Sequence, residues 1–141
     1  MEIHDAKLLL KKKVLRQNDL FTELDDAKLD FLINHANTKL LSAGEFLYRK
    51  GEEANDTFCI IIFGKMNIIA AHGNIVAAVK SGEILGEIGI IGIYNKRTAD
   101  VVALEPTSIL EWTFGDIKDK APYLLPKLKQ AALRKLSLSK K

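Results

Sequence analysis

The glycines of this chain divide it into two unequal parts. All nine of them lie after residue 43 of the 141-residue sequence, so the first forty residues contain none. From Gly44 onward, short β-branched and aromatic runs alternate with turn-forming residues at nearly regular spacing. Such spacing is typical of antiparallel sheets, in which tight turns join consecutive strands. The chain is therefore expected to begin with helices and to continue as a β-domain.

At least six runs have the character of strands. They are residues 46–48, 58–63, 67–71, 75–79, 99–104 and 108–113. A doubly wound sheet would need helical segments between its strands, and the sequence shows none there. All six runs precede a helical tail. We therefore expect a mainly β fold, with an eight-stranded antiparallel jelly-roll barrel over residues 41–114.

Helical periodicity is found on both sides of this β-domain. In the helical lead-in, residues 1–40, Asp5 can cap a segment that reaches Leu15. Asp25 can cap a second helix, because apolar residues share one face of the stretch that follows it. After the strands, residues 115–138 read as a short helix and then a longer C-terminal helix. The longer helix is expected to begin near Tyr123, with Pro126 in its first turn, where a missing N–H costs little.

The C-terminal helix carries a wide apolar stripe. Its members are Leu124, Leu125, Leu128, Ala131, Ala132 and Leu136. An arc of this width must be covered by an apolar surface. Either the chain's own barrel covers it, or the same helix of a second copy does, which allows a homodimer through this helix.

Charge and composition narrow the range of functions. The 21 basic and 18 acidic side chains leave a net charge of +3, too weak and too mixed to predict direct nucleic acid binding. No apolar run reaches the roughly 18 residues that a membrane span needs. The single cysteine, Cys59, fits a reducing cytoplasm. The three histidines lack the spacing of a metal site, and no nucleophile–base grouping stands out, so we expect neither a metal nor an enzyme.

Residues 82–99 interrupt the series of strands. Gly86 and Glu87 open a short apolar segment with further glycines, which predicts one or two helical turns whose free N–H groups can face an anion. Ten residues after Glu87, Arg97 enters the next strand beside Thr98. A guanidinium, a hydroxyl and open backbone donors suit a phosphate, whereas Glu87 suits a pair of hydroxyls such as a ribose. A surface ion pair between Glu87 and Arg97 is the alternative interpretation.

The same segment resembles a known family. The run 86–91, Gly-Glu-Ile-Gly-Ile-Ile, followed by Arg97-Thr98-Ala99, is similar to the phosphate-binding cassette of cyclic nucleotide-binding domains. These domains are the sensor modules of catabolite activator proteins, cyclic-nucleotide-dependent kinases and gated channels. Residues 44–52 resemble the first hairpin of the family, and residues 58–64 its glycine-ended central strand. The resemblance implies one cyclic nucleotide-binding domain over residues 1–141, with its cassette at 85–99 and a short cassette helix.

The resemblance also implies a role for each cassette residue. Arg97 would pair with an oxygen of the cyclic phosphate, and Ala99 would donate its backbone N–H to the phosphate. Glu87, close to the Gly86 backbone, would accept a hydrogen bond from the ribose 2′-hydroxyl. Thr98 would lie near the phosphate or the base edge. The expected ligand-binding residues are Gly86, Glu87, Ile88, Arg97, Thr98 and Ala99.

Three positions depart from the family pattern without removing a ligand contact. Leu85 stands where the family often has Phe. Gly89 and Gly92 add backbone freedom to the cassette helix.

The resemblance predicts a regulatory sensor for a cyclic nucleoside monophosphate, with cyclic AMP favoured over cyclic GMP and no cofactor. The bound ligand would close the C-terminal helix over the base as a lid. The effector module is expected in another chain or in a segment missing from this one. The alternative is a degenerate barrel that has lost its ligand and serves as a docking or dimerisation module.

Overall fold

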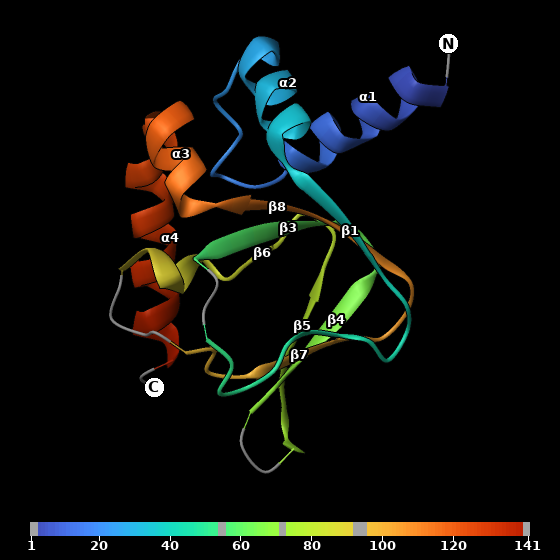
Figure 1. Cartoon of the computed structure of the whole chain (residues 1–141), viewed down its shortest axis with the longest axis vertical. Helices are drawn as coiled ribbons and strands as arrows, with labels where there is room; N and C mark the ends of the chain where they lie inside the picture. The colour runs from blue at the N-terminus through green and yellow to red at the C-terminus, as the bar shows by residue number, and fades with distance from the viewer. Residues whose placement is uncertain (1–2, 54–55, 71–72, 92–95, 140–141) are drawn as a thin grey trace.

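The structure is a computed structural model that describes residues 3–53, 56–70, 73–91 and 96–139. The chain begins with two helices, α1 (Ile3–Leu15) and α2 (Asp26–His35). Eight strands follow: β1 (Asn37–Leu41), β2 (Phe46–Tyr48), β3 (Thr57–Phe63), β4 (Lys65–Ile69), β5 (Ile75–Lys80), β6 (Ile84–Leu85), β7 (Asp100–Ala103) and β8 (Thr107–Thr113). The remaining elements are the 3-10 turns η2 (Glu87–Ile91) and η3 (Pro122–Leu124) and the helices α3 (Phe114–Lys120) and α4 (Leu125–Ser139). Figure 1 shows the helices gathered on one side of the strands.

The strands form two four-stranded sheets. Their orders are β1-β8-β3-β6 and β2-β7-β4-β5, and every pairing is antiparallel. The predicted eight antiparallel strands are confirmed, but over the described residues no ladder joins the sheets into a closed barrel. The edge strands explain this difference, because β6 has two residues and β2 has three, too few to extend a ladder. Helices α1 and α4, with 13 and 15 residues, exceed any strand in length, so the fold is mixed rather than mainly β.

Strand β3 is buried on both faces. Phe58, Ile60 and Ile62 belong to a core shared with the helices, whereas Cys59 and Ile61 belong to a core between the two sheets. A strand covered on both sides needs no polar face, which explains the uninterrupted apolar run in the sequence. β3 therefore connects the two cores of the molecule.

Two strands lie outside the runs that the sequence identifies. β1 begins at Asn37, inside the lead-in expected to be helical, and all its residues except Leu41 are exposed. β6 is only two residues long. An exposed strand lacks apolar alternation, and a two-residue strand is too short to show any period. Neither strand leaves a clear pattern in the sequence.

Helix boundaries follow local capping. Asp25 is the N-cap of α2, as predicted, and its carboxylate accepts a hydrogen bond from the Lys28 N–H at 2.8 Å. Asp5 does not cap α1, which already begins at Ile3. Thr113 caps α3, which begins at Phe114. Helix α4 begins at Leu125, after the turn η3, so its predicted start near Tyr123 is two residues early, while Pro126 lies in its first turn as expected.

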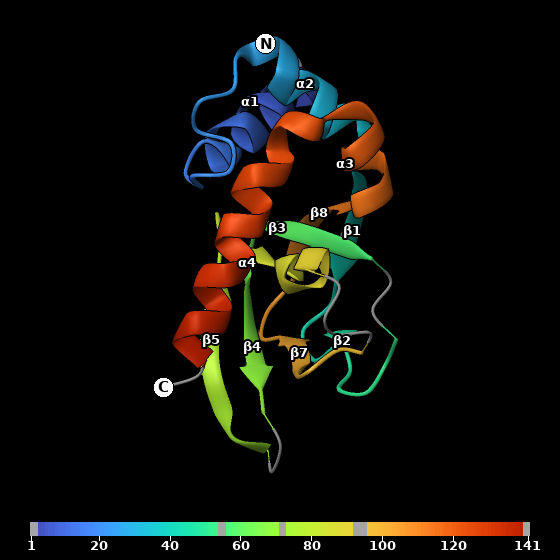
Figure 2. The same cartoon turned by 90° about the vertical axis from the view of Figure 1, so that its left-hand side faces the viewer.

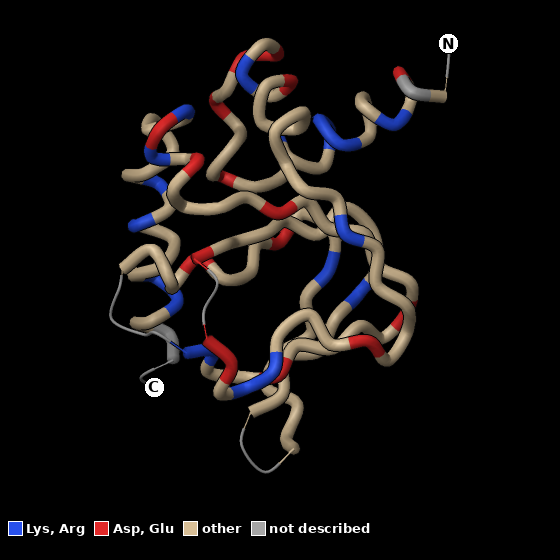
Figure 3. The backbone as a smooth tube through the Cα atoms, in the orientation of Figure 1, with Lys and Arg blue, Asp and Glu red and all other residues tan. Residues whose placement is uncertain are grey.

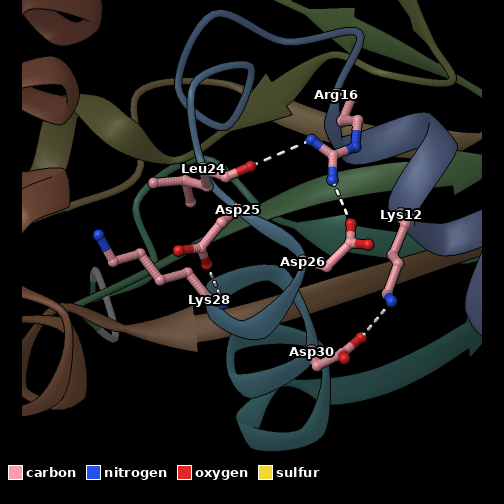
Figure 4. A network of polar contacts seen from close by, with 7 residues as sticks. All are labelled: Lys12, Arg16, Leu24, Asp25, Asp26, Lys28 and Asp30. Carbon is pink, nitrogen blue, oxygen red and sulfur yellow. Dashed lines mark hydrogen bonds and ion pairs between the residues drawn. The ribbon is translucent and has the colours of Figure 1, made fainter.

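Charged side chains hold the two N-terminal helices together (Figure 4). Lys12 of α1 pairs with Asp30 of α2 at 2.6 Å. Arg16 bonds the carboxylate of Asp26 and also donates to the Leu24 carbonyl at 3.0 Å. On the other side, Trp112 of β8 donates its indole N–H to a backbone carbonyl of α2 at 2.8 Å, which satisfies a buried donor. The ion pairs hold the two helices to each other, and the Trp112 hydrogen bond fixes α2 on the sheet β1-β8-β3-β6.

Helix α4 buries its apolar stripe within the chain. Leu124, Leu128 and Ala132 are buried, and Leu125 and Ala131 pack half-buried against the helix-side core. Figure 2 shows α4 running beside η2 and past the sheet. The chain itself therefore covers most of the stripe, which removes the reason for expecting a homodimer through it. None of the helices in the described part of the chain is long and apolar enough to span a membrane.

Candidate ligand-binding site

The six residues predicted to bind a ligand lie around one cavity of about 180 Å³. The cavity lies between η2 and the segment 96–99 that leads into β7. Residues from other elements complete its lining: Tyr48, Ile68, Leu85, Gly89, Lys96, Val101 and Lys135. The structure thus brings the two halves of the predicted cassette together. Gly92 and Ile93, at the end of the predicted cassette helix, lie outside the described residues.

Gly86 makes the sharp turn at the entry to the cassette. Its φ is +86°, in the left-handed region that side chains disfavour. A Cβ at this position would lie 2.8 Å from the Thr57 carbonyl oxygen and 2.9 Å from the Tyr48 hydroxyl. Both backbone conformation and space therefore require glycine here, which lets the backbone approach the cavity floor.

The predicted helical turn forms as η2. Its N–H groups at the start have no acceptors within the turn, as is general for short helices. Gly89 has a packing reason that the sequence does not reveal, since a Cβ there would lie 3.2 Å from the Phe114 ring. Leu85, the departure from the family's Phe, is buried in the core between the sheets. The turn is thus fixed against the core on one side and lines the cavity on the other.

Glu87 is the most deeply buried charged residue of the site, with 1% of its side chain exposed. Its Oε1 pairs with Nζ of Lys135, from α4, at 2.7 Å. Within the described part of the chain its Oε2 has no hydrogen-bond partner. Burial raises the pKa of Glu87, and the Lys135 ammonium offsets part of that rise. The ion pair at Glu87 is therefore made with Lys135, and the alternative pair with Arg97 does not form.

Arg97 lies over an aromatic ring. Its guanidinium carbon is 3.7 Å from the centroid of the Tyr48 ring, and Nη2 donates to the Thr57 hydroxyl at 3.3 Å. The Thr57 hydroxyl in turn bonds the buried Glu111 carboxylate at 3.4 Å, and Lys39 pairs with that carboxylate at 3.1 Å. Among the residues that the structure describes, no carboxylate forms an ion pair with Arg97. Its positive charge is therefore available to an anion.

The segment on either side of Arg97 is held by backbone bonds. The Arg97 N–H donates to the Glu52 carbonyl at 2.7 Å, and its own carbonyl accepts from the Gly51 N–H at 2.9 Å. Thr98 is exposed and Ala99 half-buried, and both precede β7. These bonds anchor the guanidinium-bearing residue to the loop after β2. The site is thus built from segments that lie far apart in the sequence.

Sequence reasoning missed Tyr48 and Lys135. Tyr48 lies in β2, where it appeared as one aromatic residue in a strand, and only its contact with Arg97 links it to the site. Lys135 lies in α4, whose charged residues are all basic (Figure 3). The absence of acidic residues from the sequence of α4 is the signal that the helix faces an acidic group. No cluster of three metal-ligating side chains occurs among the described residues.

Comparison with known proteins identifies the family and the fold. The sequence model of the cyclic nucleotide-binding domain matches residues 38–120, which is more than half of the chain. The chain therefore belongs to the cyclic nucleotide-binding domain family. This confirms the resemblance first seen in the cassette.

Relatives place the domain in different contexts. Uncharacterized NTE family proteins of Mycobacterium tuberculosis and Mycobacterium bovis are 28% identical over 92% of this chain, but the match spans only 22% of their length. The N-terminal domain of a transcriptional regulator from Streptomyces coelicolor is 28% identical, with a TM-score of 0.72 over 90% of this chain and 92% of that one. The regulatory domain of Toxoplasma gondii PKA, solved with cAMP, shares the fold at 23% identity and a TM-score of 0.71, over 84% of this chain and 46% of that one.

Proposed function

We propose that the cavity binds a cyclic nucleoside monophosphate and that the domain is a regulatory sensor without chemistry of its own. One observation carries the proposal. The same cavity is lined by the guanidinium of Arg97, which no carboxylate of the described residues neutralises, and by the buried carboxylate of Glu87, one oxygen of which has no partner among those residues. A ligand that satisfies both must carry an anion and a hydrogen-bond donor on one small frame.

A cyclic nucleotide has both groups. Its phosphate carries a single negative charge, which matches the single guanidinium of Arg97. Its ribose 2′-hydroxyl can donate to Oε2 of Glu87, and an unsatisfied buried acceptor of this kind costs about 1–3 kcal/mol. Inorganic phosphate would use Arg97 but would be repelled by Glu87. A neutral sugar would leave Arg97 unpaired.

The relatives support cyclic AMP as the ligand. The regulatory domain of Toxoplasma gondii PKA was solved with cAMP, and it shares the fold of this chain. Thr98 is exposed at the rim of the cavity and is compatible with either purine. We therefore favour cyclic AMP over cyclic GMP, in a cytoplasmic setting.

Helix α4 provides the route by which a ligand can act. Ligand pockets commonly measure about 300–1,000 Å³, so a whole nucleotide needs more room than this cavity gives. The cavity measures about 180 Å³, and α4 contributes Lys135 to its lining. Because Lys135 of α4 pairs with Glu87 of η2, a ligand that binds Glu87 acts on the contact between these two elements. The ligand shifts α4 because it has different affinities for two positions of that helix.

The effector is proposed to lie in another chain or another segment. The chain spans about a fifth of the length of its mycobacterial relatives, with a match covering 22% of those proteins. A change in α4 at the end of the domain would be transmitted to such a partner.

Calorimetric titration tests the proposal. Cyclic AMP should bind at one site per chain and more tightly than cyclic GMP. Inorganic phosphate and 5′-AMP serve as controls, since the first lacks the ribose and the second carries a second negative charge. Both should bind at least tenfold more weakly than cyclic AMP. If none of the four binds, the domain is not a nucleotide sensor and the docking alternative takes its place.

A further inference from the structure

The hydroxyl of Tyr48 lies buried without a partner. Only 8% of the residue is exposed, and over the described residues its Oη has no nitrogen or oxygen partner, with the thiol of Cys59 as its one side-chain hydrogen-bond neighbour. Buried tyrosine hydroxyls usually have a partner, because leaving one unsatisfied costs the fold free energy. If Tyr48 had only a structural role in β2, Phe would fill this position equally well. The hydroxyl therefore calls for another explanation.

Tyr48 lies next to Arg97 and Gly86, at the end of the cavity where we propose that the phosphate binds. It lines the cavity itself, and its ring carries the Arg97 guanidinium at 3.7 Å. The position of an added Cβ on Gly86 would lie 2.9 Å from the Tyr48 hydroxyl oxygen and 3.3 Å from Nη1 of Arg97. A neutral donor and a charged donor thus converge on the space beside Gly86.

The phenol remains a donor under all ordinary conditions. Burial is the largest cause that raises its pKa, so the hydroxyl stays protonated. Its neighbour Cys59 is fully buried, and burial raises the pKa of that thiol to about 12. A protonated thiol is a weak acceptor and does not satisfy the phenol. Apart from this thiol, the buried hydroxyl has no acceptor among the described residues, so it can donate to a ligand that reaches it.

We propose that Tyr48 is a ligand-binding residue of this site, donating its hydroxyl to the same phosphate group that Arg97 binds. The inference rests on the proposed function and adds a phosphate contact to it. Tyr48 then has two roles: its ring fixes the guanidinium from below, and its hydroxyl supplies a second donor. Gly86, where the Tyr48 hydroxyl and the Thr57 carbonyl leave no room for a side chain, brings the backbone of the cassette close to both donors.

The test compares wild type with Tyr48→Phe, which removes the hydroxyl and keeps the ring under Arg97. Tyr123→Phe is the matched control, because Tyr123 is 38% exposed and does not line the cavity. Cyclic AMP should bind Tyr48→Phe about 10-fold to 100-fold more weakly, as expected for a hydrogen bond to a charged group. Tyr123→Phe should change affinity less than about twofold.

The two phosphorothioate epimers of cyclic AMP identify the contact. Each replaces one exocyclic phosphate oxygen by sulfur, a poor acceptor. With one epimer the loss caused by Tyr48→Phe should nearly vanish, and with the other it should persist. Equal losses with cyclic AMP and both epimers would overturn the contact and leave Tyr48 as a support for Arg97. Unchanged cyclic AMP binding by Tyr48→Phe would also overturn it.

Stability without ligand provides a second measurement. Since the only partner of the hydroxyl among the described residues is the weakly accepting thiol of Cys59, Tyr48→Phe should melt at the wild-type temperature or above it. A lower melting temperature would mean that the hydroxyl is satisfied inside the fold, which contradicts the inference. Wild-type protein that fails to bind cyclic AMP refutes the proposed function and this inference with it. Wild-type binding that Tyr48→Phe leaves intact refutes the inference alone.

Discussion

Replacing Lys135 by Met tests the ion pair that joins α4 to the cassette turn. The change keeps most of the side-chain stem and removes the ammonium, which lies 2.7 Å from Oε1 of Glu87 and 3.0 Å from the Ile84 carbonyl. Glu87 is 1% exposed and Lys135 39% exposed at the side chain. The carboxylate that remains would be buried without its cation, and we expect α4 to be held less firmly against η2.

The cost of this change has an upper limit, because Glu87 can take up a proton instead. Its ordinary pKa is 4.5, and each pH unit above that value costs about 1.4 kcal/mol of protonation free energy. That limit is about 3.4 kcal/mol at pH 7 and about 0.7 kcal/mol at pH 5. Because Lys135 is partly exposed, solvent screening reduces the contribution of the ion pair to the free energy of unfolding. We therefore expect Lys135→Met to lose about 1–3 kcal/mol at pH 7 and less than about 1 kcal/mol at pH 5.

The direction with pH follows from linkage. Burial raises the folded-state pKa of Glu87 above 4.5, so ionising it destabilises the fold as pH rises from that value through the folded pKa. Removing Lys135 raises the folded pKa further and extends this loss to higher pH. The variant should therefore differ most from wild type near neutral pH.

Urea unfolding at pH 5 and pH 7 measures the effect. Lys129→Met is the matched control, since Lys129 is an exposed lysine on the same helix with the same charge. Adding Glu87→Gln to Lys135→Met should remove the pH dependence. If Lys135→Met and Lys129→Met unfold alike at pH 7, or if the loss is the same at both pH values, the ion pair does not hold α4 as described.

Two further substitutions test the cassette. Gly86→Ala should destabilise the fold by about 1–3 kcal/mol more than Gly44→Ala. The two glycines have nearly the same positive φ, +86° and +87°, but of the two only Gly86 would bring a Cβ to 2.8 Å from a carbonyl oxygen. Equal urea midpoints of the two variants would contradict the crowding at Gly86. Glu87→Gln should weaken cyclic AMP binding by about 1.5–3 kcal/mol, and 2′-deoxy cyclic AMP should bind wild type and variant almost equally weakly in calorimetry. Additive losses would place the ribose away from Glu87.

The sequence predicts most of the strands because their burial is periodic or continuous. The run 58–63 is apolar throughout since β3 is covered on both faces, and the turn glycines mark where the strands end. β1 could not be found in this way, because four of its five residues are exposed. The arrangement into two sheets depends on the short edge strands, and nothing in their composition specifies it.

In the candidate site, too, some residues can be predicted from the sequence and others cannot. Gly86, Glu87 and Arg97 could be identified because their chemistry lies within one short segment of the sequence. The partner of Glu87 could not, because Lys135 lies 48 residues away along the chain and meets it only when α4 packs on η2. Tyr48 reaches Arg97 from β2 in the same way. Local patterns thus predict the candidate ligand-binding residues, and tertiary packing decides which residues support them.

Thermal stabilisation by cyclic AMP tests the central claim most directly, in wild type, Arg97→Leu and Arg49→Leu. Arg49 is a matched control, since its guanidinium also lies over an aromatic ring, 3.9 Å from the Phe46 centroid, but it does not line the cavity. Ligand-induced stabilisation follows affinity. Saturating cyclic AMP should stabilise wild type and Arg49→Leu alike, while Arg97→Leu should lose about 3–5 kcal/mol of binding, a hundredfold or more. Equal stabilisation of all three proteins would contradict the account of this cavity as a cyclic nucleotide site.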